Sequence, residues 1–431
     1  MNEAQTKYDY IEPALREAGW GSIGDSRVRK EYSITQGRLI GHGRRTKPLS
    51  ADYVLQYKGR NLAVIEAKAR EKYHTEGVAQ AKDYAERLQI RYTYATNGLK
   101  IYGIDMDDGK EGEISKFPTP DELWEMTFPL PKEENAIAVF EQEHELLSIP
   151  FEDRSGTWQP RYYQQNAISN VIKSIAAGEK RILLTMATGT GKTAIAFQIA
   201  WKLFGARWNI TREPSRRPRI LFLADRNILA DQAYNSFSAF SSDAITRIDP
   251  DTIRKKGGVP RNASVFFTIF QTFMAGDGGP NFEGYEPDFF DFIIVDECHR
   301  GGAKDESEWR RILEYFEPAT QLGLTATPKR KHNADTYGYF GEPVYTYALK
   351  DGIEDGFLTP FKVRQMASTI DEYVYTGDDE VVKGEIEIGD GFREDDFNTR
   401  IIIPEREKSR VKEFMRQIDP MQKTLVFCAT Q

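Results

Sequence analysis

The sequence predicts an α/β protein built from two sheets, and three stretches of the chain support this prediction. A short apolar run at 182–184 is followed by a Gly-rich loop and then by apolar residues at helical spacing. A second apolar run at 289–295 ends in two acidic residues. Nearer the amino terminus, strand-like stretches at 52–57 and 62–68 are separated by a short turn. The first two patterns are typical of a buried parallel sheet, and the third is typical of an antiparallel hairpin.

Length and composition limit the class of protein. The chain has 431 residues, with 40% hydrophobic and 29% charged residues, which suits two to four globular domains. No apolar run approaches the roughly 20 residues that a membrane-spanning helix needs, and the start of the chain has no secretory character. We therefore expect a cytoplasmic protein without membrane contact. Cys298 and Cys428 are too few for a disulfide framework and do not suggest a zinc site.

The net charge of −8 argues against a protein that coats nucleic acid along its whole surface. Basic residues nevertheless gather in three stretches, at 27–47, 207–219 and 329–331, whereas acidic residues concentrate at 371–396. The first stretch contains Arg27, Arg29, Lys30, Arg38, Arg44, Arg45 and Lys47, and the second contains Arg207, Arg212, Arg216, Arg217 and Arg219. Contact with DNA phosphates is one interpretation of these stretches, and solvated surface charge is the other.

The amino-terminal region begins with an expected amphipathic helix over 7–18, followed by the hairpin. Because side chains alternate along a strand, Glu66 and Lys68 project from the same face. If residues 58–60 form a three-residue connection, Asp52 pairs directly opposite Glu66 and shares that face. Two carboxylates and a lysine then converge. This arrangement suits Mg²⁺ held by acidic oxygens, with the ammonium group placing or polarising water for phosphodiester hydrolysis.

The spacing of Asp52 and the Glu66-x-Lys68 pair resembles the PD-(D/E)xK nucleases, although a surface salt bridge would give the same letters. The next expected helix, over 74–88, places Gln80 and Tyr84 four residues apart on one face. This pair resembles a further motif of nucleases that belong to DNA-processing motors. The resemblance implies that Gln80 and Tyr84 shape the nuclease site or contact DNA. An ordinary half-buried helix face is the alternative.

Hairpin and proline patterns further along the chain suggest its domain boundaries. Stretches at 92–96 and 100–104 predict a second hairpin, and several prolines follow between 118 and 131. We expect a nuclease-like domain at 1–128, a linker at 129–158 with a helix over 135–147, and a motor domain at 159–350. An insertion and the start of a second motor domain are expected at 351–431.

The Gly-rich loop after the 182–184 strand predicts a phosphate-binding site. Backbone N–H groups and the positive end of the following helix dipole would point at phosphate oxygens. Lys192 can reach the β- and γ-phosphates of ATP, and the Thr193 hydroxyl can hold Mg²⁺. Met186 stands where the usual pattern has Gly, and a chance Gly/Thr-rich loop is the alternative. The expected ATP-binding residues of this loop are Thr188, Gly189, Thr190, Gly191, Lys192 and Thr193.

Motifs around the loop resemble those of superfamily 2 helicases, which implies a RecA-like parallel sheet. Arg161 and Gln164 match the element that reads adenine, since an amide can both donate and accept. In the Asp296-Glu297-Cys298-His299 stretch, Asp296 would hold the Mg²⁺ of the nucleotide, and Glu297 would orient or deprotonate the attacking water. An exposed Gln at a helix start and a surface acidic cluster are the respective alternatives.

Other positions match the parts of that family that contact DNA or couple the motor domains. The DNA-contact positions are Arg226, Thr268, Gln271 and Thr272, which would hydrogen-bond backbone phosphates without reading bases. Thr325 and Thr327, in the Thr325-Ala326-Thr327-Pro328 stretch, would couple the nucleotide state to a partner domain.

The last part of the chain is expected to open a second motor domain, with a helix at 410–418 and a buried strand at 424–430. The family arginines that complete the ATP site from a second domain are absent from the sequence. Since such an arginine supplies much of the catalytic rate, we expect this chain to bind ATP but to hydrolyse it poorly.

Taken together, a nuclease-like region before a helicase-like motor resembles the motor and cleavage (R, or HsdR) subunit of Type I restriction enzymes. The resemblance implies an endonuclease that uses ATP and Mg²⁺, translocates double-stranded DNA and cleaves away from the recognition site. It also implies partner methyltransferase (M) and specificity (S) subunits. Two alternatives stay open: a helicase-nuclease of another restriction or repair type, and an ATP-gated DNA-binding module with an inactive nuclease site.

Overall fold

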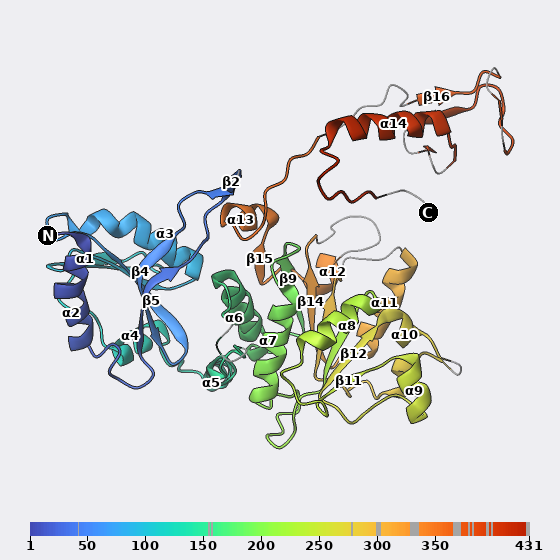
Figure 1. Cartoon of the computed structure of the whole chain (residues 1–431). Coiled ribbons are helices and arrows are strands. Elements are labelled where there is room, and N and C mark those ends of the chain that lie inside the picture. The colour runs from blue at the N-terminus through green and yellow to red at the C-terminus, as the bar shows by residue number, and fades with distance from the viewer. Residues whose placement is uncertain are drawn as a thin grey trace. The chain divides into compact units, whose positions relative to one another are not determined.

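The structure is a computed structural model that describes most of the chain. Positions outside the described residues are 42, 154–155, 157, 277–278, 299–302, 328–335, 365–371, 378–379, 382, 394–395, 398–399 and 428–431, together with the side chains of 303–308 and 372. Contacts divide the chain into two compact units, Met1–Pro360 and Phe361–Gln431. The first unit contains two large sheets, one drawn in blue to cyan and the other in green to orange (Figure 1).

The first sheet has six strands in the order β1-β4-β5-β6-β7-β8. Its strands are β1 (Arg27–Ser33), β4 (Ser50–Tyr57), β5 (Arg60–Ala67), β6 (Tyr92–Thr96), β7 (Ile101–Asp105) and β8 (Glu111–Ile114). β5 and β6 are parallel, and the other neighbours are antiparallel. Both predicted hairpins, β4–β5 and β6–β7, are therefore confirmed.

The β4–β5 hairpin differs from the prediction at its turn. Its connection has two residues, Lys58 (φ 48°) and Gly59 (φ 74°), rather than three. The register then shifts by one residue near Leu55, where a bulge interrupts the ladder. Beyond the bulge, Tyr53 pairs with Ile65, so extending this register by one residue brings Asp52 opposite Glu66. The predicted pairing is right, but the predicted connection is wrong.

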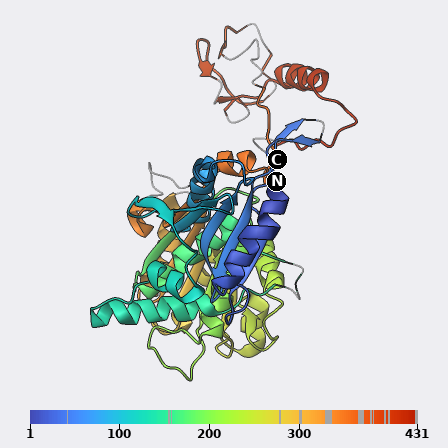
Figure 2. The ribbon, with the colours of Figure 1, turned by 90° about the vertical axis from the view of Figure 1, so that its left-hand side faces the viewer.

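Helices cover both faces of the first sheet. One face packs against a π-helical turn (Lys7–Ile11), α2 (Glu12–Glu17) and α4 (Pro120–Thr127), and α1 (Glu3–Thr6) precedes the π-helical turn. The dark-blue amino-terminal helices lie beside the blue strands in Figure 2. The other face packs against α3 (Val78–Leu88), which follows a 3₁₀ turn at His74–Gly77. The expected helices over 7–18 and 74–88 are both confirmed.

The second sheet has seven parallel strands in the order β11-β12-β10-β13-β14-β9-β15. Its strands are β9 (Arg181–Met186), β10 (Ile220–Ala224), β11 (Ile245–Arg247), β12 (Val265–Ile269), β13 (Phe292–Asp296), β14 (Thr320–Thr325) and β15 (Tyr345–Tyr347). The predicted parallel α/β sheet is confirmed. Since all strands run the same way, the residues that follow them meet at one edge.

Two apolar cores lie on opposite faces of this sheet, because alternate strand residues such as Phe222 and Leu223 belong to different clusters. The first core includes residues of α6 (Tyr162–Ala176), α7 (Lys192–Gly205) and α8 (Asn227–Ser236). The second includes residues of α10 (Phe270–Met274), α11 (Ala303–Tyr315) and α12 (Thr336–Phe340). The first unit also contains α9 (Pro250–Lys256), a 3₁₀ turn at Asn281–Gly284 and α13 (Leu349–Glu354).

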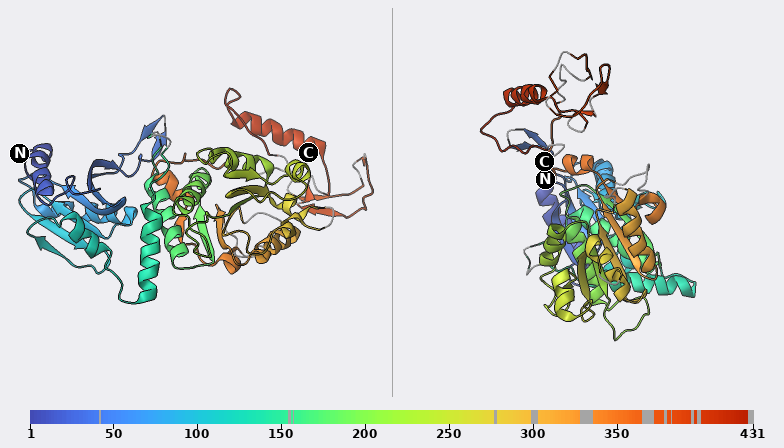
Figure 3. Two further views of the ribbon diagram at one scale, coloured as in Figure 1. Left: turned by 90° about the horizontal axis from the view of Figure 1, so that it is seen from below. Right: turned by 90° about the vertical axis from the view of Figure 1, so that its right-hand side faces the viewer.

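The expected linker helix is α5 (Glu134–Ser148), which packs on α6 and α7 (Figure 3). Lys202 on α7 holds its carboxyl end. The Lys202 ammonium is buried and donates to the carbonyl oxygens of Leu147, over 3.2 Å, and Ile149. Burial lowers the pKa of Lys202 to about 8. These bonds satisfy carbonyls that the end of a helix otherwise leaves without partners.

The second unit contains β16 (Glu372–Val374), β17 (Gly391–Arg393) and α14 (Pro404–Gln417). α14 confirms the helix expected at 410–418. The strand expected at 424–430 is wrong for residues 424–427, which are exposed and irregular, and the rest of it lies outside the described residues. An apolar run becomes a strand only when a neighbouring strand pairs with its backbone, and none does so here. No helix in the described ranges is long and apolar enough to cross a membrane.

Candidate functional site

The Gly-rich loop that is predicted to bind phosphate lies between β9 and α7, as expected. Gly189 (φ 84°) and Gly191 (φ 88°) adopt left-handed conformations that favour glycine. The Thr190 hydroxyl donates to Ala187 O over 2.6 Å and closes the loop. Thr188 is exposed at the tip of the loop. Backbone N–H groups and the start of α7 are therefore available at one place.

Gln164 lies directly beneath this loop. Its Nε2 donates to Thr190 O over 3.0 Å, and its Oε1 accepts from the backbone N–H of Arg161 over 3.0 Å. The Tyr163 hydroxyl also donates to Thr190 O, over 3.1 Å. A Cβ atom at Gly191 would lie 2.6 Å from Gln164 Nε2, so this glycine permits the close packing. Gln164 thus supports the loop from below, and its predicted reading of adenine stays a prediction.

Lys192 and the acidic stretch after β13 face the same space. Lys192 Nζ lies 3.3 Å from Met186 O and 3.5 Å from Glu297 Oε1. Glu297 has a left-handed backbone conformation (φ 54°), which is uncommon for a non-glycine residue and often occurs at functional sites. Asp296 ends β13, two strands away from β9 at the same sheet edge. The structure therefore brings Lys192 and Glu297 together, with Asp296 at the same edge of the sheet.

The strand between them, β14, ends at Thr325. Thr325 is fully buried, and its hydroxyl accepts the backbone N–H of Thr327 over 3.2 Å. Thr327 is exposed beside the site. Pro328 and His299, which complete the two predicted motifs, lie outside the described residues.

The chemistry of this edge fits a nucleoside triphosphate with Mg²⁺. The loop offers N–H donors and the ammonium group of Lys192 to phosphate oxygens. The hydroxyl of Thr193, at the second position of α7, and the carboxylate of Asp296 are hard oxygen ligands that suit Mg²⁺. A carboxylate such as that of Glu297 can orient or deprotonate a water molecule that attacks the γ-phosphate.

A second candidate site lies on the first sheet, where Asp52, Glu66 and Lys68 converge. The backbone N–H of Ala67 donates to Asp52 Oδ2 over 2.6 Å, which fixes this carboxylate against the end of β5. Lys68 Nζ donates to Glu66 Oε1 over 2.8 Å. The structure therefore unites the three side chains that the hairpin pattern predicted.

Glu66 has the properties of a cation ligand. Burial raises its pKa to about 7, and the nearby Asp52 carboxylate adds to the rise although Lys68 opposes it. Glu66 Oε2 is buried and accepts no hydrogen bond in the described part of the chain. A buried carboxylate oxygen without a partner is costly unless a cation binds it. No group of three His, Cys, Asp or Glu side chains among the described residues could hold a metal, so water and phosphate would complete the Mg²⁺ shell here.

Sequence reasoning missed Lys7 at this site. Its ammonium group bonds Asp52 Oδ1 and Glu31, and these contacts raise its pKa although burial opposes the rise. Lys7 comes from the π-helical turn, and its partner Asp52 lies 45 residues further along the chain, so no local pattern links the two. A cation therefore already neutralises Asp52.

Gln80 and Tyr84 extend the same hydrogen-bonded group. Gln80 Nε2 donates to the Tyr84 hydroxyl over 2.7 Å, and Gln80 Oε1 accepts from Lys68 Nζ over 3.4 Å. Tyr84 is buried in the core beneath α3. Both residues thus support Lys68, whereas DNA contact by them stays a prediction.

The predicted DNA-contact residues separate into two groups. Arg226 and Gln271 are exposed near the carboxyl ends of β10 and β12. Thr268 is completely buried and donates its hydroxyl to Ile248 O over 2.8 Å. Thr272 is also buried, in α10. The prediction that these two threonines contact phosphates is therefore wrong in this structure, because both residues are buried.

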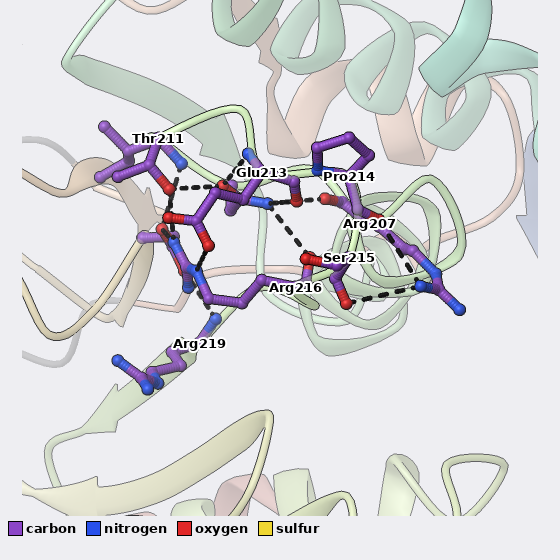
Figure 4. Close-up of polar contacts among 10 residues, drawn as sticks. Arg207, Thr211, Glu213, Pro214, Ser215, Arg216 and Arg219 are labelled. Carbon is purple, nitrogen blue, oxygen red and sulfur yellow. Dashed lines mark hydrogen bonds and ion pairs between the residues drawn. The ribbon is translucent and has the colours of Figure 1, made fainter.

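The second basic stretch forms an ordered loop before β10 (Figure 4). Arg216 makes two 2.7 Å bonds to the buried Asp291 carboxylate, which also accepts the backbone N–H of Arg219 over 2.8 Å. Arg207 donates to carbonyl oxygens of Pro214 and Ser215. Because it precedes β10, this loop lies at the sheet edge opposite the ATP site. Arg216 therefore stabilises the loop through its bonds to Asp291. The third basic stretch, at 329–331, lies outside the described residues.

One buried carboxylate joins the two sheets of the first unit. Asp355 accepts from Arg87 on α3 over 3.0 Å and from the hydroxyls of Tyr162, over 2.5 Å, and Tyr347, over 2.7 Å. Burial and this carboxylate raise the pKa of both tyrosines. No sequence motif marks Asp355. Its importance comes from contacts between residues far apart in the chain.

Two families of known proteins match separate parts of the chain. Residues 24–118 match the family described as Type I restriction enzyme R protein N terminus, and residues 157–330 match the family described as Type III restriction enzyme, res subunit. The chain is also 38% identical to the Type I restriction enzyme EcoAI endonuclease subunit of Escherichia coli, over 99% of this chain and 52% of that subunit. The chain is similar to the amino-terminal part of the R subunits of Type I restriction enzymes.

Two further comparisons agree with that similarity. The chain is 30% identical to the EcoKI endonuclease subunit of Escherichia coli K12, over 80% of the chain and 31% of that subunit. It is 42% identical to a solved fragment described as an HsdR subunit of a type I restriction enzyme from Vibrio vulnificus YJ016, with a TM-score of 0.66. That match covers 83% of this chain and 61% of the solved chain. The chain spans about half the length of the EcoAI subunit.

Proposed function

We propose that this chain acts in an ATP- and Mg²⁺-dependent restriction endonuclease that translocates duplex DNA and cleaves it away from the recognition site. The observation that carries the proposal is the presence of two acidic sites in one chain. One contains Lys192 and Glu297 at 3.5 Å, and the other contains Lys68 and Glu66 at 2.8 Å.

In the proposed ATP site, the loop and Lys192 bind the phosphates. Glu297 orients the attacking water and takes its proton. Asp296 and Thr193 would hold Mg²⁺, which neutralises charge on the β- and γ-phosphates when bound. Thr325 and Thr327, at the end of β14, couple the occupied state of the site to the partner motor domain.

In the proposed nuclease site, of the PD-(D/E)xK type, Asp52 and Glu66 would hold a second Mg²⁺. Lys68 then places the attacking water beside the scissile phosphate. Gln80 fixes Lys68 through the 3.4 Å contact, and Tyr84 fixes Gln80. Site recognition belongs to partner methyltransferase and specificity subunits.

A second candidate function is an ATP-gated DNA-binding module whose nuclease site is inactive. The contact between Lys7 and Asp52 favours it, because an ammonium group already neutralises a required carboxylate. Reconstitution with methyltransferase and specificity subunits tests both functions through ATP-dependent cleavage of DNA. We expect Asp52→Ala to abolish cleavage and leave ATP hydrolysis, whereas Lys192→Ala abolishes both. Full cleavage by Asp52→Ala would support the inactive-site alternative.

A further inference from the structure

Residues 37–41 and 43–47 leave the first sheet as a two-stranded ribbon, which we call the basic arm. Within it, β2 (Leu39–Gly41) pairs antiparallel with β3 (Arg44–Arg45), and β2 is labelled in Figure 1. Below this pair, the Thr46 backbone N–H donates to Arg38 O, and the Arg38 N–H donates to the Thr46 hydroxyl, each over 2.8 Å. The arm therefore has its own short hydrogen-bonded ladder outside the sheet.

The arm carries positive charge without compensation. Its cations are Arg38, Arg44, Arg45 and Lys47, all exposed. No acidic residue occurs anywhere from position 32 to position 51, although the whole chain has a net charge of −8. None of the four cations forms an ion pair with any described residue. A surface that only needs to be soluble has no reason to collect cations and exclude acids in this way.

The root of the arm is fixed on both sides. Ile34 and Leu49 anchor it in the apolar core of the first unit. The Gln36 N–H donates to Asp355 O over 2.8 Å, just after α13. Arg45 is the brace, since its guanidinium donates to Gly37 O over 3.0 Å and to Gly356 O over 2.8 Å. The direction of the arm is therefore set before any ligand binds, which lowers the entropy cost of binding.

Two glycines make this brace possible. A Cβ atom at Gly37 (φ 76°) would lie 2.1 Å from Thr46 O. A Cβ atom at Gly356 (φ 80°) would lie 2.0 Å from Gly37 O. Backbone approaches this close exclude every other residue type without rearrangement. Two positions of the chain are therefore restricted to glycine so that the exposed ribbon is held in place.

We propose that the basic arm lies in the major groove of duplex DNA, with Arg38, Arg44 and Lys47 on phosphates and Ile40 against base edges. The inference rests on the proposed function and names the part of the chain that grips its substrate. The major groove, about 12 Å wide, admits a two-stranded β-ribbon. Phosphate contacts fix position without reading sequence, which suits a motor that moves along DNA. Ile40, 59% exposed beside the cations, offers an apolar surface to the bases.

Fluorescence anisotropy with the 431-residue chain and a labelled DNA duplex tests the arm. The variant replaces Arg38, Arg44 and Lys47 together by Gln, and it retains Arg45 so that the brace stays intact. Each lost phosphate contact reduces the slope of log affinity against log salt by about 0.9, so we expect a reduction of about 2 to 3 between about 50 and 200 mM salt. At about 100 mM salt, affinity should fall roughly 10-fold to 100-fold. The control replaces Lys116, Lys132 and Lys173, three exposed cations elsewhere in the first unit, by Gln.

The outcomes separate the arm from the proposed function. If the unaltered chain binds duplex DNA and the arm and control variants have equal slopes of log affinity against log salt, the inference about the basic arm is wrong. The proposed function is not affected by that result. No duplex binding by the unaltered chain would overturn both. An arm variant that keeps the DNA slope but no longer associates with the partner subunits would make the arm a protein-docking element, which also overturns the inference. A minor-groove ligand such as distamycin should leave the slope difference in place, and its loss would overturn the major-groove placement.

Discussion

Lys192 Nζ lies 3.5 Å from Glu297 Oε1, across the end of the strand that separates β9 from β13. The cation that would bind phosphate and the carboxylate that would act on water thus already form a pair. Binding of a nucleotide would have to draw Lys192 from this pair toward the phosphates. The two residues should therefore contribute differently to binding and to hydrolysis.

We expect Lys192→Ala to weaken binding of a fluorescent ATP analogue at least about 10-fold, because it removes the ammonium group and leaves Glu297 to repel phosphate. Glu297→Gln should retain or improve binding, since it removes that negative charge, but should abolish hydrolysis. Titration by fluorescence measures the first effect, and phosphate release by the assembled enzyme measures the second. Lys173→Ala, an exposed cation on α6, is the control. Equal binding by Lys192→Ala and the unaltered chain would contradict the assignment of the loop.

The raised pKa of Glu66 predicts an unusual dependence of stability on pH. Its pKa is raised to about 7 by burial and by Asp52, whereas the unfolded chain has about 4.3. The folded state then binds the extra proton between these values, so stability falls as pH rises through them. The loss is complete above the folded pKa.

We therefore expect Glu66→Gln to stabilise the metal-free chain by about 1 to 3 kcal/mol at about pH 8 and to change little at about pH 5. Urea unfolding in the presence of EDTA measures the difference. Glu76→Gln, at an exposed position of the neighbouring turn, should change stability by less than about 0.5 kcal/mol at either pH. A stabilisation that is the same at both pH values would show that titration of Glu66 is not its cause.

Removal of the Asp355 carboxylate is expected to cause a large loss of stability. Asp355→Ala would leave Arg87, Tyr162 and Tyr347 without their shared acceptor, so we expect a cost of about 3 kcal/mol or more in urea unfolding. Asp355→Asn should cost less, because its amide oxygen still accepts. Asp351→Ala tests a neighbouring carboxylate that only caps α13 and should cost about 1 kcal/mol. Equal costs for Asp355→Ala and Asp351→Ala would remove the proposed joining role of Asp355.

The sequence predicted best where one short element decides the outcome. Strand alternation put Glu66 and Lys68 on one face, and the loop before α7 placed Lys192 without long-range information. The opposition of Asp52 and Glu66 was right although the turn was wrong, since a bulge near Leu55 compensated for the shorter connection. Local rules fix which face a side chain occupies more firmly than they fix the turn.

The sequence did not predict the roles of residues that depend on packing. Thr268 lies in a sequence pattern that fits phosphate contact, but its side chain is buried. This burial becomes apparent only when α10 and β11 are in place. Arg216 reads as part of a basic patch until the buried Asp291, 75 residues away, pairs with it. Asp355 and Lys7 likewise gain their partners from distant segments. Sequence spacing carries no information about such contacts.

Lys68 offers the most direct test of the central claim, that the site on the first sheet cuts DNA while the parallel sheet supplies the motor. In an enzyme reconstituted with the proposed methyltransferase and specificity subunits, DNA cleavage and ATP hydrolysis are measured together for Lys68→Ala and for Lys82→Ala, a half-buried lysine on α3. We expect Lys68→Ala to reduce cleavage by at least about 100-fold with ATP hydrolysis unchanged, and Lys82→Ala to change neither. Cleavage by Lys68→Ala at the rate of the unaltered enzyme would contradict the claim.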